Sequence, residues 1–136
     1  MAKDSFVGFQ EKVEIPEEFQ LLEIEELLPS SKNIEALFLL ISDPTQISLW
    51  LEEVQSFDSR PGGKLLFLNG TQAICTTFNL GKEISFISDY FGNFSAKVIK
   101  EKNGRALLVK FALLTDIGEK KSEDFLSIIS RLQEQL

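Results

Sequence analysis

The hydrophobic and polar positions of the chain follow two different periods. Leu22 and Ile24 alternate with glutamates, and a period of two residues is typical of a half-buried β-strand. Across 34–41 the apolar residues recur at helical spacing, which predicts an amphipathic helix. Because serine is a favoured N-cap, Ser30 or Ser31 is expected to begin this helix.

A second short helix is predicted directly after the first. Asp43-Pro44 should end the first helix, because the residue before a proline is pushed out of the helical region. Asp43 can then cap the second helix, with Pro44 at its first position. The apolar side of this second helix carries Ile47, Trp50 and Leu51.

From residue 54 to residue 114 the chain reads as a run of strands separated by turn residues. Asn103-Gly104 is a strong hairpin signal, because this pair tolerates the positive φ that tight hairpins require. The short connections indicate antiparallel neighbours, since a parallel crossover needs about a dozen residues or more. The expected strands are Val54–Asp58, Lys64–Asn69, Thr71–Leu80, Glu83–Ser88, Asn93–Lys100 and Arg105–Leu114.

The chain closes with a predicted helix from about Glu119 to Gln135. Its apolar positions form a stripe at helical spacing, made of Phe125, Ile128, Ile129 and Leu132. Such a stripe needs a surface to cover, and the sheet is the available candidate. The pattern therefore predicts that this helix packs on the sheet.

The length of 136 residues predicts a single domain, which we place at residues 19–136. Residues 1–18 are acid-rich and contain Pro16. They are interpreted as an N-terminal arm or as an extra strand, because Val13 and Ile15 alternate with charged residues.

The charge pattern argues against some partners and compartments. A net charge of −7 disfavours nucleic acid, and the basic stretch of Lys97, Lys100, Lys102 and Arg105 is interpreted as the solvated side of a hairpin. No apolar run approaches the roughly 20 residues that span a bilayer, and the first residues do not resemble a secretory signal. With Cys75 as the single cysteine, these features favour the cytoplasm.

The residue types limit the chemistry. The chain has no histidine, which excludes the usual catalytic triads and removes the commonest metal ligand. Cys75 lies in an apolar strand without a histidine to activate it and is interpreted as a core or wall residue. We therefore predict no catalytic residue, no metal and no cofactor.

Gly62-Gly63-Lys64 raises the question of a phosphate-binding loop. A Walker loop needs a second glycine at a fixed spacing, a hydroxyl residue after the lysine, and a helix that follows. Here an apolar strand follows Lys64 directly. The glycines are therefore interpreted as turn residues that serve backbone geometry.

Three segments resemble the motifs of one protein family: IEALFLLISDPTQISLWL (34–51), RPGGKLLFLNG (60–70) and FLSIISRLQEQL (125–136). In this order they resemble the START-related, birch-pollen-allergen-like (SRPBCC) superfamily. The resemblance is to the branch named for the activator of heat-shock protein 90 ATPase, in particular its C-terminal domain. It covers about Phe19 to Leu136. The tryptophan that is usual in the middle strand is replaced by Phe86, and residues 1–18 have no match.

The resemblance implies an α+β helix-grip fold. In this fold a curved antiparallel sheet wraps around a long C-terminal helix, and two short helices lie between the first and second strands. The family often holds an apolar ligand in a cavity between sheet and helix, but it does not imply one activity. The activator's separate N-terminal domain, which makes much of its chaperone contact, has no counterpart here, so ATPase activation is not expected.

The aromatic residues leave two interpretations open. Most of the 12 phenylalanines lie on the apolar phase of the predicted elements, where they form either a solid core or the wall of an apolar cavity. Thr76, Thr77, Ser85 and Ser95 are candidates for hydroxyls that orient a ligand, or they are exposed. On the cavity interpretation the ligand-binding residues are Trp50, Phe67, Ile74, Phe78, Phe86, Phe94, Phe111, Phe125 and Ile129.

The preferred hypothesis is non-enzymatic binding of a small apolar molecule, a lipid or an aromatic compound. One alternative is a protein-interaction domain, a homodimer or chaperone partner, that uses the acidic arm and an exposed strand edge. The other is a cyclase-like enzyme, which would need a buried Asp, Glu or Lys as acid or base.

Overall fold

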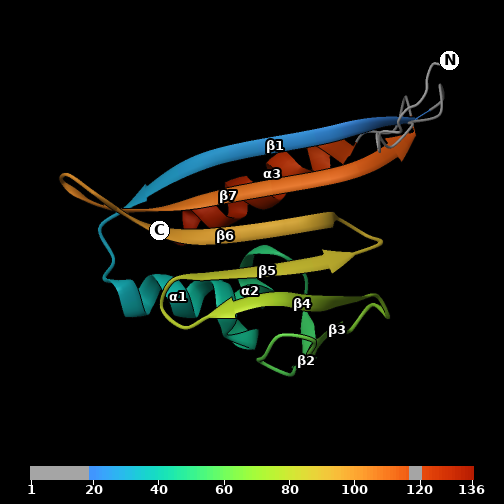
Figure 1. Ribbon diagram of the computed structural model, residues 1–136, viewed down its shortest axis with the longest axis horizontal. Helices are drawn as coiled ribbons and strands as arrows, with labels where there is room; N and C mark the ends of the chain where they lie inside the picture. Colours follow the sequence, from blue (N-terminus) through green and yellow to red (C-terminus); the bar gives the residue numbers. More distant parts are fainter. Residues whose placement is uncertain (1–18, 117–120) are drawn as a thin grey trace, which may run out of the picture.

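The computed structural model describes residues 19–116 and 121–136 (Figure 1). The predicted arm at residues 1–18 lies outside these ranges. The elements follow in the order β1 (Phe19–Ser30), α1 (Ile34–Ser42), α2 (Pro44–Trp50), β2 (Val54–Phe57), β3 (Lys64–Phe67), β4 (Gln72–Asn79), β5 (Glu83–Ser88), β6 (Gly92–Glu101), β7 (Gly104–Asp116) and α3 (Lys121–Glu134).

The seven strands form one antiparallel sheet in the order β1-β7-β6-β5-β4-β3-β2. From β2 to β7 each strand pairs with the next, and β1 closes the far edge by pairing with β7 over its whole length. The helices lie against one face of this curved sheet, with α3 along β7 and β1, α1 beside β5 and β6, and α2 between α1, α3 and β2 (Figure 1). This arrangement confirms the predicted α+β helix-grip fold.

The helix caps confirm one sequence prediction and correct another. Asp43 caps α2 as expected, since its Oδ2 accepts a hydrogen bond from the Gln46 amide at 3.2 Å, and Pro44 begins the helix. The cap of α1 is Asn33, whose Oδ1 accepts from the Ala36 amide at 2.8 Å. Ser30 and Ser31 do not cap α1, because β1 stays paired with β7 as far as Ser30.

The core is an apolar layer between the sheet and the helices. Trp50 is fully buried in it, and the indole Nε1–H donates to the carbonyl oxygen of Leu40 at 2.8 Å. The apolar stripe of α3 is also buried, as the helical spacing predicted, and it consists of Phe125, Ile128, Ile129 and Leu132. Among the described residues, the buried polar side chain is that of Ser42, whose hydroxyl donates to the Phe38 carbonyl at 2.6 Å.

Candidate ligand-binding site

A continuous series of aromatic contacts crosses the molecule from α2 to α3. The ring centroids of Trp50 and Phe94 are 5.5 Å apart, and those of Phe94 and Phe111 are 4.9 Å apart. Phe111 of the sheet stacks on Phe125 of α3 with centroids 4.5 Å apart and planes 9° apart. At this point the sheet and the C-terminal helix are in direct contact.

A second series runs from the same centre toward α1 and β2. Phe86 lies 6.4 Å from Phe94 and 5.5 Å from Phe57, measured between ring centroids. Phe78 then contacts Phe57 at 6.4 Å and Phe38 at 5.5 Å. The predicted inward aromatics therefore meet one another in the core.

The residues that the sequence suggested as ligand-binding differ in how far the structure buries them. Seven are buried in the core: Trp50, Phe67, Phe86, Phe94, Phe111, Phe125 and Ile129. Phe78 is half-buried and packs against them. The inward placement of Ile74 is wrong. Its cross-strand partner is Ile87, which is 45% exposed, whereas the next pair, Cys75 and Phe86, is fully buried.

The error at Ile74 has a definite cause. The register of β4 against β5 shifts between Cys75 and Thr77, so β4 has a β-bulge at this point. A bulge adds one residue to one strand and changes which face the following side chains occupy. Unbroken alternation placed Ile74 and Phe78 on one face, but the bulge puts them on opposite faces.

The hydroxyl candidates lie on the face of the sheet away from the helices. Thr76, Ser85 and Ser95 line a shallow pocket of about 330 Å³ there, together with Glu23, Asn93 and Lys110. Thr77 pairs with Ser85 on the same face. These groups therefore do not orient a ligand inside the apolar layer.

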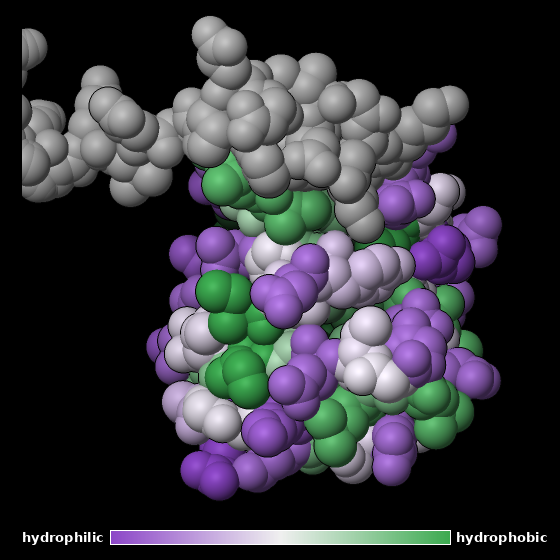
Figure 2. Space-filling model, turned by 90° about the vertical axis from the view of Figure 1, so that its right-hand side faces the viewer, coloured by the Kyte–Doolittle hydropathy of each residue, from purple (hydrophilic) through white to green (hydrophobic). Residues whose placement is uncertain are grey.

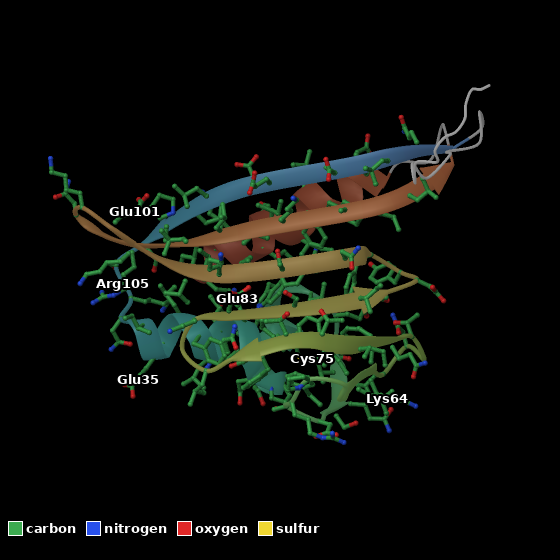
Figure 3. All side chains as sticks on the ribbon, in the orientation of Figure 1. Glu35, Lys64, Cys75, Glu83, Glu101 and Arg105 are labelled. Carbon is green, nitrogen blue, oxygen red and sulfur yellow. The ribbon has the colours of Figure 1, made fainter. Side chains whose placement is uncertain are left out.

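A larger pocket, which we call the end pocket, lies at one end of the sheet. Its volume is about 620 Å³. It is bounded by the end of β1, the β6–β7 hairpin and the residue that ends the chain after α3, and in Figure 3 Glu101 and Arg105 mark this end. Its lining residues are Pro29, Ser30, Ser31, Glu101, Lys102, Asn103, Gly104, Arg105 and Leu136.

Arg105 is a half-buried cation that lines the end pocket. Its Nη1 donates to the carbonyl oxygen of Lys32 at 3.3 Å, while its Nε is buried and makes no hydrogen bond. Ser30 provides a hydroxyl beside it, which accepts from the Lys32 amide at 3.0 Å and donates to the main-chain oxygen of Leu136 at 3.4 Å. The contacts from Arg105 to Lys32 and from Ser30 to Leu136 join segments that meet only in the folded chain.

Sequence reasoning missed this pocket because it assigned Arg105 to the solvated side of a hairpin. Lys97, Lys100 and Lys102 are exposed as expected, but Arg105 is only half-exposed. The sequence did contain a signal, which is the position of Arg105 in the alternation of β7. Arg105 stands two residues before Leu107 and four before Val109, so it lies on the inward face of the strand. A cation that continues the inward alternation of a buried apolar series indicates that the apolar core ends there and a polar site begins.

Among the described residues, the thiol of Cys75 and the phenol of Tyr90 have a shifted pKa. Burial raises the pKa of the Cys75 thiol, partly offset by its hydrogen bond to the Thr77 carbonyl at 3.3 Å. Burial, then the negative charges of Glu52 and Asp124, raise the pKa of the Tyr90 phenol, against a lowering by Arg131. Both shifts favour the neutral form, and neither group lies in the end pocket.

The opposite end of the molecule has a different surface. Figure 2 shows hydrophobic side chains that reach the surface there in several separate places between hydrophilic ones. Scattered exposed apolar side chains are ordinary on soluble domains and do not mark a site. Within residues 19–116 and 121–136, no cluster of three potential metal ligands occurs, and no helix is long and apolar enough to cross a membrane.

Comparison with known proteins supports the fold. The chain matches no protein-family model and no curated protein sequence. A protein of unknown function from Staphylococcus aureus is similar in structure, with a TM-score of 0.69 and 11% identity over 87% of this chain and 94% of that one. An AHSA1-like protein from Aeromonas hydrophila has a TM-score of 0.61 and 13% identity over 84% and 91% of the two chains.

CalU16 from Micromonospora echinospora is a third similar structure. It has a TM-score of 0.52 and 16% identity, and the likeness covers 85% of this chain and 82% of CalU16. At such low identity these comparisons establish the shared fold, in agreement with the superfamily that the sequence motifs suggested.

Proposed function

We propose that this chain binds a small, largely apolar molecule, without transforming it, between the sheet and the C-terminal helix. The observation that supports this is the end pocket, where β1, the β6–β7 hairpin and the last residue after α3 enclose about 620 Å³. Sites for small molecules are usually clefts of roughly 300–1,000 Å³. The end pocket is therefore large enough for such a ligand.

The apolar part of the ligand has a defined direction. Ser30 pairs with Arg105 at the pocket, and Leu28 pairs with Leu107 one step further inward. Both leucines are buried, as is Leu132 of α3. A ligand that enters beside Ser30 and Arg105 thus meets the apolar layer after one pair of residues.

The buried aromatic residues have a different role in this proposal from the direct ligand contact that the sequence suggested. Because Phe111 stacks directly on Phe125, no ligand lies between these two rings in this conformation. We propose that the buried aromatics form the inner wall behind Leu107 and Leu132, and that the ligand itself occupies the end pocket. Ile74 is not part of this wall.

Binding is preferred to catalysis because of the groups that surround the pocket. Among the described residues that line it, the acidic side chain is that of Glu101, which is exposed. General acid or base catalysis usually relies on a group whose pKa is tuned by burial or by a neighbouring charge. The homodimer and chaperone alternatives stay predictions.

The proposal is tested by titrating isotopically labelled protein with 1-octanol, a small apolar probe, and following backbone amides by NMR. We expect shifts of the amides around Leu28–Ser31, Glu101–Leu107 and Leu132–Leu136. Replacing Ser31, an exposed pocket residue, by tryptophan should fill the pocket and weaken binding at least tenfold.

Ser59→Trp is the matched control, because Ser59 is an exposed serine that does not line the pocket. It should leave the binding of octanol unchanged. Absence of shifts around the pocket, or equal binding by the Ser31→Trp variant, would refute the proposal.

A further inference from the structure

We infer that the end pocket recognises an anionic group, a carboxylate or a phosphate, through the guanidinium of Arg105. This inference rests on the proposed function and adds the chemical class of the ligand: an amphiphile with an anionic head and an apolar body. Four features of the described residues support it.

The first feature is the position of Arg105. In the sheet it pairs with Ser30 on one side and with Lys100 on the other. Side chains alternate along a strand, so Arg105 lies on the same face as Leu107 and Val109, which are fully buried. The sheet therefore holds this guanidinium at the border of the apolar layer, where water screens its charge less than at an open surface.

The second feature is the unused hydrogen-bonding capacity of Arg105. A guanidinium has five N–H donors in a planar fork, and the structure satisfies it with one contact, from Nη1 to the Lys32 carbonyl at 3.3 Å. Its Nε is buried and has no acceptor. The two Nη groups are not buried without a partner in the same way, and together they form a fork that matches the two oxygens of a carboxylate or phosphate.

The third feature is that no internal group neutralises Arg105. Among the described residues, no carboxylate lies at salt-bridge distance from it, whereas Arg60 pairs with Asp58 at 2.8 Å. The C-terminal end of α3 does not use Arg105 as a cap either. The carbonyls of Leu132 and Gln133 accept from the amides of residues 135 and 136 at 3.0 and 3.1 Å.

The fourth feature is the local charge. The chain carries a net charge of −7, yet four of its 14 lysine and arginine residues lie at or beside the end pocket. Lys102 and Arg105 line the pocket together with one acidic side chain, that of Glu101, and with the main-chain end at Leu136. Lys100 is the cross-strand partner of Arg105, and Lys32 follows Ser31 on the pocket wall. An anion is therefore attracted to this end of an otherwise acidic molecule.

These features define how the ligand would lie. The anionic head accepts hydrogen bonds from the Nη groups of Arg105, beside the Ser30 hydroxyl that also lines the pocket. The apolar body extends toward Leu28 and Leu107. A carboxylate and a phosphate share this chemistry, so the head group is resolved by experiment.

The test compares octanoate, octyl phosphate, 1-octanol and inorganic phosphate on the full chain, by calorimetry and amide NMR shifts. For the wild type we expect octanoate or octyl phosphate to bind at least tenfold more tightly than octanol. Whichever of these two probes binds more tightly identifies the preferred head group. Inorganic phosphate should compete with them weakly, because it has no apolar body.

The variants distinguish the hydrogen-bonding geometry of the Arg105 guanidinium from its positive charge. Arg105→Gln should abolish the preference for the anionic probes over octanol, whereas Arg105→Lys should keep only part of this preference. Lys97→Gln is the matched control, because Lys97 is an exposed cation in β6 that does not line the pocket. Circular dichroism and the melting temperature establish that each variant is folded.

The outcomes distinguish this inference from the proposed function. Equal binding of octanol and octanoate by the wild type overturns the inference and leaves the proposed function standing. Binding of inorganic phosphate at Arg105 without binding of any apolar probe supports the anion site and overturns the proposed function. No binding of any probe overturns both.

Discussion

Trp50 shows how one side chain connects three elements of this protein. Its indole is fully buried and donates to the carbonyl of Leu40 in α1 at 2.8 Å. Its ring contacts Phe94 of β6, and its own carbonyl accepts from Nε of Arg131 in α3 at 3.2 Å. A buried indole N–H usually needs such a partner, so this residue holds α1 and α2 in one orientation.

Cys75 is a buried residue whose protonation state bears on stability. Its side chain is fully buried, and burial raises the pKa of the thiol above its ordinary value of 9.0. A raised pKa in the folded state means that the stabilisation is complete below pH 9.0 and is lost as the pH rises through the folded-state pKa.

We therefore predict that the free energy of unfolding decreases as the pH rises above 9.0, and that Cys75→Ala reduces this decrease. Urea unfolding at a series of pH values, followed by circular dichroism, measures both. The pKa of Tyr90 is also raised, from 10.0, so the effect of Cys75 is best read in the lower part of this range. An identical pH dependence in the two proteins would contradict the prediction.

At the scale of the element, α3 is the clearest case of a helix that is stabilised by one face. Its buried face meets the sheet, most directly where Phe125 stacks on Phe111. Its outer face carries Leu126, which is 50% exposed. The helix is thus held by packing on the sheet rather than by its own propensity.

Phe125 and Leu126 are neighbours in α3, so alanine substitutions at the two positions can be compared directly. Phe125→Ala should lower the free energy of unfolding by about 3–5 kcal/mol, because it removes a buried ring and leaves a cavity. Leu126→Ala should change it by roughly 0.5 kcal/mol or less, as is usual for surface positions. Urea unfolding measures both, and similar losses in the two variants would show that Phe125 does not anchor α3.

Gly92 shows how an element can depend on a close backbone approach. It begins β6 with φ of +70°, and a Cβ there would lie 2.3 Å from the carbonyl oxygen of Ala112 in β7. Any other residue would force the two strands apart. Glycine at this position allows β6 and β7 to pair from their first residues.

At the scale of the whole molecule, the sheet and the helices share one core. The buried cluster includes residues from β1, α1, α2, β3 to β7 and α3. Because the same layer stabilises all of these elements, none has a separate core that would let it unfold alone.

We predict a single cooperative unfolding transition. Trp50, the single tryptophan, reports the centre of the core by fluorescence, and circular dichroism at far-ultraviolet wavelengths reports the secondary structure. The two urea midpoints should coincide. A secondary-structure signal that changes before the fluorescence would show that part of the fold, such as α3, is released first.

Several predictions of the fold were correct because the sequence patterns behind them depend on residues that are close together in the chain. Asp43-Pro44 ends one helix and begins the next through contacts within four residues. The stripe of α3 and the turns between strands likewise need only the local sequence. The bulge in β4 was not predictable from alternation, because it depends on the register against β5.

The sequence by itself therefore determined the order and type of the elements and the residues of the core, since helix caps, turns and periodicity act over a few positions. Tertiary structure alone decided which face Ile74 occupies and which residue caps α1. It also decided where the end pocket lies. Arg105, Ser30 and Leu136 meet there although 106 positions separate the last two, and only the pairing of β1 with β7, with α3 packed on the sheet, brings such distant residues together.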